Sequence, residues 1–333
     1  MKSFMSPSIA SQRVLLSVAA AGLMAGGLLL GKAGYSQAAP QGSWATKSPI
    51  PAARNEVVAA VVNDKIYVLG GNFPRVQYDV AANEEYDPAT DRWRSRMPMP
   101  QGLNHMAAAV LNGRIYTVGG FTGDGHKGAN ASVFEYDPAA DTWRTLAPLS
   151  RPRGSVSAVA VDGKIHALGG RENETDVVAA HEIYDPAINT WSAGAPLPKA
   201  RDHMVAVMVE GKIHAIGGRF GANEDMTNLH EVYNPKTNTW TSAPPLPTAR
   251  GGGSGTLYRD FILVLGGEDD TRTYREHEGF DVKNNRWVTF APLPAGRHGF
   301  GASTVGRSAY FISGAQGRGG RDVTDEVLVF TLP

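Results

Sequence analysis

Residues 162–191 read DGKIHALGGRENETDVVAAHEIYDPAINTW, and the landmarks in this stretch recur through the chain. Their order is a polar turn, a short apolar run, a glycine pair, Tyr-Asp-Pro and a tryptophan. The tryptophans follow one another at intervals of 47 to 50 residues: Trp44, Trp93, Trp143, Trp191, Trp240 and Trp287. A period of this length indicates a repeat architecture in which each repeat is one supersecondary unit.

Each repeat predicts four strands. A small apolar strand, such as 57–62, leads through the polar turn Asn63-Asp64 into a second strand that ends at the glycine pair. The second strand is apolar almost throughout, which predicts burial of both its faces. The third strand ends at Tyr-Asp-Pro, because proline cannot continue a ladder, and the fourth carries the tryptophan. Four antiparallel strands repeated six times predict an all-β fold, a six-bladed β-propeller over residues 39–333.

The two ends of the chain predict how the propeller closes. Trp44 belongs to a fourth strand that has no first three strands before it. Residues 299–305, 309–313 and 325–332 supply three strands with no tryptophan after them. We therefore expect the N-terminal strand to complete the last blade, which removes both exposed sheet edges.

The succession of Gly-Gly, Tyr-Asp-Pro, Trp and Pro-x-Pro-x-x-Arg resembles the kelch-repeat family, and the resemblance covers about residues 44–333. It implies the propeller scaffold but leaves the function open, because one fold hosts many functions. The chain is more distantly similar to the periplasmic N-acetylneuraminate epimerases, which implies an acidic sugar as a candidate substrate. Kelch-type galactose oxidases need a cysteine for their copper cofactor, and this chain has none.

Residues 1–38 predict a signal peptide. Lys2 and Arg13 precede the apolar run 14–30, and Ser36-Gln37-Ala38 places small residues where an export peptidase cleaves. The alternative is an uncleaved anchor, because a run of this length can just span a bilayer. We expect cleavage, a periplasmic or secreted protein of the bacterial cell envelope, and no membrane contact afterwards. The formal net charge of zero makes nucleic acid a poor candidate partner.

The repeats differ in length only between the second glycine and the next aromatic residue, where the second and third strands are joined. Variation confined to one class of loop predicts a binding face. Phe121 and Phe220 in these loops suit a sugar ring or a peptide side chain, unless each folds back onto its own loop. Arg171, Arg219 and Glu268 directly follow glycine pairs and belong to the same face.

Another set of equivalent residues lies 16 positions before each glycine pair, just before the first strand, and therefore at the same face. We call this set the column. Five of its six members are arginine: Arg54, Leu103, Arg153, Arg201, Arg250 and Arg297. A ring of guanidinium groups around the channel mouth would favour a carboxylate, sulfate, phosphate or acidic peptide. The alternative is a structural role, in which each arginine pairs with carboxylates or backbone carbonyls between blades.

We therefore expect a monomeric, non-enzymatic propeller that binds a protein, an anionic small molecule or a sugar, without metal or cofactor. The alternative is an epimerase or mutarotase for an acidic sugar such as N-acetylneuraminate, with Glu172 or Glu268 as the acid–base group. His105, His203 and His298 lie one or two residues past the column. Adjacent strand positions point to opposite faces, so we do not expect these three histidines to bind one metal.

Overall fold

The computed structural model describes residues 41–73, 78–123, 126–221 and 225–333. The chain divides into two units, Met1–Ala38 and Ala39–Pro333. The predicted signal peptide lies outside the described residues and stays a prediction. No helix in the described ranges is long and apolar enough to span a bilayer.

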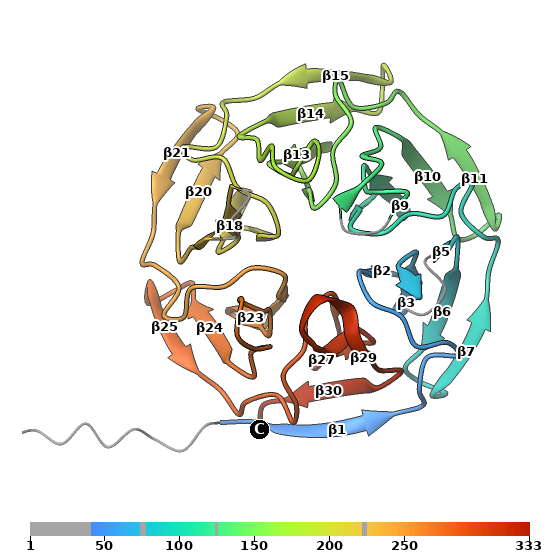
Figure 1. Cartoon of the computed structure of the whole chain (residues 1–333), viewed down its shortest axis with the longest axis vertical. Helices are drawn as coiled ribbons and strands as arrows, with labels where there is room; N and C mark the ends of the chain where they lie inside the picture. The colour runs from blue at the N-terminus through green and yellow to red at the C-terminus, as the bar shows by residue number, and fades with distance from the viewer. Residues whose placement is uncertain (1–40, 74–77, 124–125, 222–224) are drawn as a thin grey trace, which may run out of the picture. The chain divides into compact units, whose positions relative to one another are not determined.

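The second unit consists of six four-stranded antiparallel sheets arranged around a common axis (Figure 1). The innermost strands are β2 (Val58–Val62), β8 (Ala107–Leu111), β12 (Ser157–Val161), β16 (Val205–Val209), β22 (Ser254–Tyr258) and β26 (Gly301–Val305). The second strands are β3 (Lys65–Leu69), β9 (Arg114–Val118), β13 (Lys164–Leu168), β17 (Lys212–Ile216), β23 (Phe261–Leu265) and β27 (Ser308–Ile312).

The outer half of each sheet follows in the same order. The third strands are β6 (Asn83–Asp87), β10 (Val133–Asp137), β14 (His181–Asp185), β20 (His230–Asn234), β24 (His277–Asp281) and β30 (Val327–Thr331). The outermost strands are β7 (Arg92–Ser95), β11 (Thr142–Thr145), β15 (Thr190–Ala193), β21 (Thr239–Ser242), β25 (Arg286–Thr289) and β1 (Ser43–Lys47). The six-bladed β-propeller predicted from the repeats is confirmed.

Three of the variable loops contain a short hairpin of their own. The hairpin strands are β4 (Asn72–Phe73) with β5 (Tyr78–Asp79), β18 (Arg219–Phe220) with β19 (Asp225–Met226), and β28 (Ala315–Gly317) with β29 (Arg321–Val323). The short 3-10 helix η2 (Arg318–Gly320) lies between the last two strands.

The N-terminal strand closes the propeller as predicted. Strand β1 pairs antiparallel with β30, and Trp44 lies opposite Phe330 (Figure 1). The last blade therefore has the order β1-β30-β27-β26 and contains both ends of the unit. Because the closing strand is joined by backbone hydrogen bonds, this blade has the same four strands as the other five.

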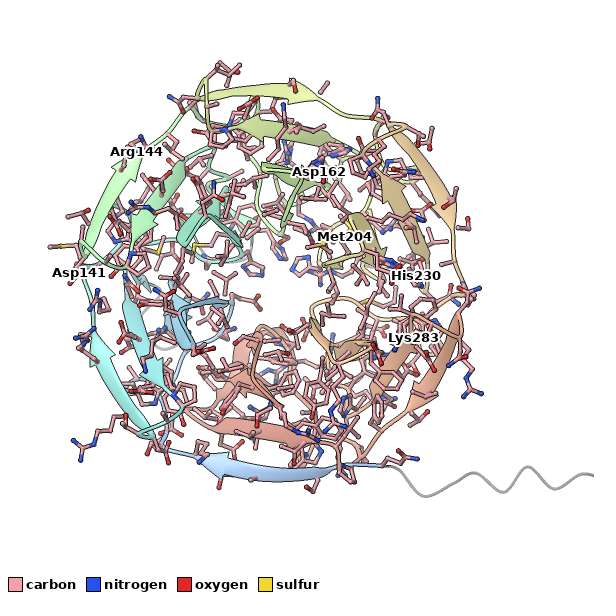
Figure 2. The ribbon with its side chains drawn as sticks, turned by 180° about the vertical axis from the view of Figure 1, so that it is seen from behind. Asp141, Arg144, Asp162, Met204, His230 and Lys283 are labelled. Carbon is pink, nitrogen blue, oxygen red and sulfur yellow. The ribbon has the colours of Figure 1, made fainter. Side chains whose placement is uncertain are left out.

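The core is divided among the interfaces between blades. Six apolar clusters are present in the described residues, and each combines side chains from two neighbouring blades. Figure 2 shows side chains filling the space between the sheets, with Asp141 and Arg144 at the outer rim and Met204 nearer the axis.

The glycine pairs allow neighbouring blades to approach closely. Gly169 has a φ of 58°, and a Cβ there would overlap the carbonyl oxygen of Arg201 in the next blade. Gly170 then donates its N–H to that same carbonyl at 3.1 Å. Only glycine meets both requirements without strain, which explains why the pair recurs in the sequence.

The tryptophans lie between blades and belong to a repeated contact that we call the interblade clasp. In the third blade, Trp191 Nε1 donates to the carbonyl of Ala147 in the preceding blade at 2.8 Å. Asn189 Oδ1 accepts the N–H of Ala147 at 2.9 Å and the hydroxyl of Tyr184 at 2.7 Å. The acceptor of the clasp is Asp91, Asp141, Asn189 or Asn238 in the first four blades.

The fifth blade keeps only the tryptophan of this clasp. Trp287 donates to the carbonyl of Pro244 at 2.8 Å. Pro244 has no N–H to donate, and Phe280 replaces the tyrosine and has no hydroxyl. Asn285 therefore occupies the acceptor position without either donor.

Candidate functional site

The five arginines of the column are interior residues. Their relative exposures are 0% for Arg54, Arg201 and Arg297, 1% for Arg153 and 2% for Arg250. Each pairs with a glutamate of its own blade: Arg54 with Glu84, Arg153 with Glu182, Arg201 with Glu231, Arg250 with Glu278, and Arg297 with Glu326. The predicted ring around the channel mouth does not form, because each guanidinium lies inside a blade beside a carboxylate. The alternative prediction, a structural role with carboxylate partners, describes these arginines better. It placed the partners between blades, however, whereas each pair lies within one blade.

The second blade shows what this pairing does. Leu103 stands in the arginine column, and Phe134 stands where other blades have the glutamate. Both side chains belong to one apolar cluster and are buried. Because both charges are replaced together, the arginine and the glutamate act as a unit of the scaffold.

The two loop phenylalanines have different surroundings. Phe121 is fully buried, and its ring lies against Gly154, where any Cβ would overlap it. Of the two alternatives left open for Phe121, the buried one holds: its ring also lies 5.4 Å from the ring of His126 in its own loop. Phe220 is half-buried, and Nζ of Lys199 lies 3.4 Å from its ring centroid.

A second set of equivalent positions, two residues past the column, surrounds the propeller axis. We call it the hub ring: Glu56, His105, Ser155, His203, Gly252 and Gly299, with φ values of 54°, 49°, 49°, 51°, 69° and 61°. Five hub-ring residues donate their backbone N–H to the carbonyl of the preceding hub-ring residue at 2.8–3.3 Å: His105, Ser155, His203, Gly252 and Gly299. Val57 closes the circle by donating to Gly299 at 3.4 Å. The backbone φ angle is therefore similar at all six positions, although Val57 replaces Glu56 as the donor in the first blade, whereas the side chains differ.

A cavity of about 190 Å³ lies at the hub ring. Glu56, His105 and His203 line it together with residues of the variable loops. Arg219 and Glu268, both predicted at this face, are among its lining residues. Arg171 is not among them: it is buried and pairs with Asp202 at 2.6 Å.

One part of the cavity is acidic. Glu56 Oε2 lies 3.2 Å from Nε2 of His105, and Glu268 Oε2 lies 3.2 Å from Nδ1 of His298. Glu268 also accepts the N–H of Gly319 at 3.0 Å. Burial, reinforced by the charge of Glu268, raises the pKa of Glu56 to about 8. Glu56 is therefore protonated at neutral pH.

The other part lies beside two guanidinium groups. Asp202 lies between them, with Oδ2 2.6 Å from Arg171 and Oδ1 3.5 Å from Nε of Arg219. Nη2 of Arg219 lies 2.7 Å from Nε2 of His203 and 3.4 Å from Nε2 of His126. Burial, with the charge of Arg219, lowers the pKa of His126 to about 3, so this imidazole is neutral.

The acidic part contains a proton donor beside a proton acceptor. Nδ1 of His105 lies 2.5 Å from Oδ1 of Asn104, which accepts a hydrogen, so Nδ1 carries the proton. Nε2 therefore presents its lone pair to the protonated carboxyl of Glu56. Burial lowers the pKa of His105 well below its ordinary value, which keeps the imidazole neutral. A ligand hydroxyl in this position could exchange a proton with either group.

Sequence reasoning missed Glu56 and His126. The signal for Glu56 was present: the hub-ring position contains Glu, His, Ser or Gly in different repeats, although the column beside it is nearly constant. His126 is in a variable loop, so no repeat position could relate it to His105 and His203.

Comparisons with known proteins agree with the propeller. The Kelch motif matches residues 53–100 and 103–150, and the KLHDC2/KLHL20/DRC7 Kelch-repeats domain matches residues 150–315. No curated protein matches the chain. A solved structure described as "Structure of YjhT" is similar with a TM-score of 0.72 and 18% identity, over 85% of this chain and 96% of that one. At this identity the likeness concerns the fold alone. The consecutive kelch matches and the six-bladed architecture show that this chain belongs to the kelch-repeat β-propeller family.

Proposed function

We propose that this propeller binds a small acidic sugar, or a similar polyhydroxy acid, in the cavity at the hub ring. The observation that carries the proposal is the charge arrangement there: Arg219 lies in one part of the cavity and Glu56 and Glu268 in another. A carboxylate suits the guanidinium, and hydroxyl groups suit the glutamates and imidazoles.

The size of the cavity supports a small ligand over a protein partner. About 190 Å³ is below the roughly 300–1,000 Å³ of sites for drug-sized molecules. The buried column arginines already have carboxylate partners, so the proposal does not depend on them. It moves the expected recognition from an arginine ring to the few polar side chains of the hub.

A second candidate is catalysis on the same kind of ligand, as an epimerase or mutarotase. The observation that favours it is the 3.2 Å contact between Glu56 Oε2 and His105 Nε2. A protonated carboxyl beside a neutral imidazole provides the acid and the base that a ring-opening reaction needs. In this proposal Glu56 replaces Glu172 and Glu268, the acid–base candidates expected from the sequence.

Calorimetric titration with N-acetylneuraminate, glucuronate and glucose tests the binding proposal. We expect the two acids to bind and glucose to bind much more weakly. Arg219→Gln should lower acid affinity by about 10- to 100-fold, because it removes a charged hydrogen bond. Arg144→Gln, which removes an exposed arginine of the outer strand β11, is the control and should bind normally.

Gly252→Asn is a second variant that keeps every charge. A Cβ at Gly252 would meet its nearest atoms at 3.8–4.0 Å, which is ordinary contact, and its φ of 69° suits asparagine. The longer side chain should block the cavity while the protein stays folded. Equal binding of glucose and the acids, or normal acid binding by both site variants, would exclude the proposed site.

Proton NMR of anomer exchange in N-acetylneuraminate tests the catalytic candidate. We expect acceleration by the wild type and its loss in Glu56→Gln, with binding retained. Binding without acceleration would leave a binding protein and exclude the enzyme.

We also propose export to the periplasm or the exterior, with cleavage after Ala38 and a monomeric mature protein. The support is residues 1–38, whose composition is typical of a signal peptide. Mass spectrometry of the protein recovered from the periplasm should give Ala39 as the first residue. A full-length chain in the membrane fraction would instead indicate an anchor.

A further inference from the structure

Three histidines converge at the edge of the cavity. His105 and His203 come from the hub ring, and His126 comes from the loop after β9. Their ring centroids are 4.9 Å apart for His105 and His126, and 5.1 Å apart for each of the other two pairs. The ring planes cross at 65°, 79° and 85°, so the rings surround a point rather than stack.

We propose that His105, His126 and His203 form a binding site for a divalent transition metal ion such as Zn²⁺. One nitrogen from each ring can be chosen so that all three lie within 4.8 Å of one another. Three nitrogens bound to one tetrahedral zinc lie about 3.4 Å apart, given a Zn–N bond of about 2.1 Å. A contraction of at most about 1.4 Å in each separation therefore brings the set to bonding distance.

Asn104 orients one of the three rings as a metal ligand. Nδ1 of His105 lies 2.5 Å from Oδ1 of Asn104, which accepts a hydrogen and keeps the proton on Nδ1. The Nε2 lone pair of His105 is left for a metal, which would take the place of the contact with Glu56. The ring of His203 lies beside a carboxylate, with Nδ1 3.1 Å from Oδ1 of Asp202. Three imidazoles with an open fourth position are a recurrent arrangement for zinc.

Other buried histidines in this chain lack this arrangement. Nδ1 of His166 lies 2.9 Å from Nε2 of His181, and Nδ1 of His214 lies 2.8 Å from Nε2 of His230. In each of these pairs one ring donates to the other, so the facing nitrogens satisfy each other. The contacts of the hub histidines are instead with Asp202, Asn104, Ser155, Glu56 and Arg219.

Arg219 competes with the metal. Its Nη2 lies 2.7 Å from Nε2 and 2.9 Å from Nδ1 of His203, and 3.4 Å from Nε2 of His126. A metal ion would displace this group, and the guanidinium would repel the ion. Arg219 therefore lowers the affinity of the site for the metal ion. Replacing Arg219 should raise that affinity, whereas replacing a histidine ligand should lower it.

Calorimetry of the chelator-treated wild-type protein with Zn²⁺ tests the proposal without any sugar present. We expect one equivalent to bind, and Co²⁺ to give the visible absorption of a low-symmetry nitrogen site. His126→Gln should lower zinc affinity by more than the roughly 10- to 100-fold typical of residues that only support ligands. Arg219→Gln should raise the affinity.

His298→Gln is the matched control, because His298 lines the same cavity but contacts Glu268 instead of the three rings. Its zinc affinity should stay within about twofold of the wild type, and thermal unfolding should confirm that all variants are folded. No zinc binding by the wild type would overturn the proposal. So would an equal loss in His298→Gln and His126→Gln, or a lower affinity in Arg219→Gln. Sugar binding in the absence of zinc would leave the proposed function intact.

Discussion

Arg201 and His203 are two residues apart, yet their positions follow opposite rules across the six blades. Arginine recurs at the first position with a glutamate partner, which is buried in four blades and partly exposed in the sixth. The second blade is the exception and replaces both charges with Leu103 and Phe134. The hub ring keeps its backbone in every blade, but its side chains are not matched in this way. A residue pair that recurs in the blades, and is replaced as a pair where it does not, identifies the scaffold. Side chains that vary on a similar backbone identify the candidate site.

The largest expected effect comes from breaking one interior pair. Arg201→Leu would leave Glu231 buried without its partner and should lower the free energy of unfolding by about 3–5 kcal/mol. Adding Glu231→Phe copies the second blade and should restore most of the loss. Urea denaturation measures both. A stable Arg201→Leu variant that no longer binds ligand would assign the arginines to the binding face after all.

A smaller effect is expected from Glu56 as a function of pH. The folded protein keeps the Glu56 proton up to a pKa of about 8, whereas the unfolded chain releases it near pH 4.5. The folded state therefore binds more protons between these values, and stability falls as pH rises from about 5 to 8. Glu56 alone can lower the free energy of unfolding by at most about 1.4 kcal/mol per pH unit.

The check is to compare the wild type with Glu56→Gln by urea denaturation at pH 5.5 and pH 8. Glutamine cannot ionise, so the variant should lose less stability over this range than the wild type does. Equal losses in the two proteins would show that Glu56 ionises normally.

The smallest effect concerns the interblade clasp, for which the chain supplies its own control. Asn189→Ala removes the acceptor for Ala147 and Tyr184 and should lower the free energy of unfolding by about 1–2 kcal/mol. Asn285→Ala in the fifth blade removes the same side chain from the same backbone conformation, without those hydrogen bonds. It should cost at least about 1 kcal/mol less, because only the strain of a positive φ is common to both. Equal costs in calorimetric unfolding would show that the clasp adds nothing.

The fold could be predicted because its causes are local and repeated. Each glycine pair marks a close approach between blades, each Tyr-Asp-Pro ends a strand, and Trp44 without a preceding repeat reveals the closure. Most of the site could not be predicted in this way. Phe121 lies in a variable loop, where the sequence does not reveal whether its ring is exposed. The ring is buried because it packs against Gly154 of the next blade, where there is no side chain in the way.

The amino-acid sequence by itself determined the number of blades, their strand order and the face that holds the variable loops, since period and turn chemistry act within a few residues. Tertiary structure alone decided which charges are buried and which side chains meet. Strand pairing places Glu231 beside Arg201, and the axis brings His105, His126 and His203 together from different repeats. These contacts depend on distances across the propeller, which cannot be read from the spacing of residues along the chain.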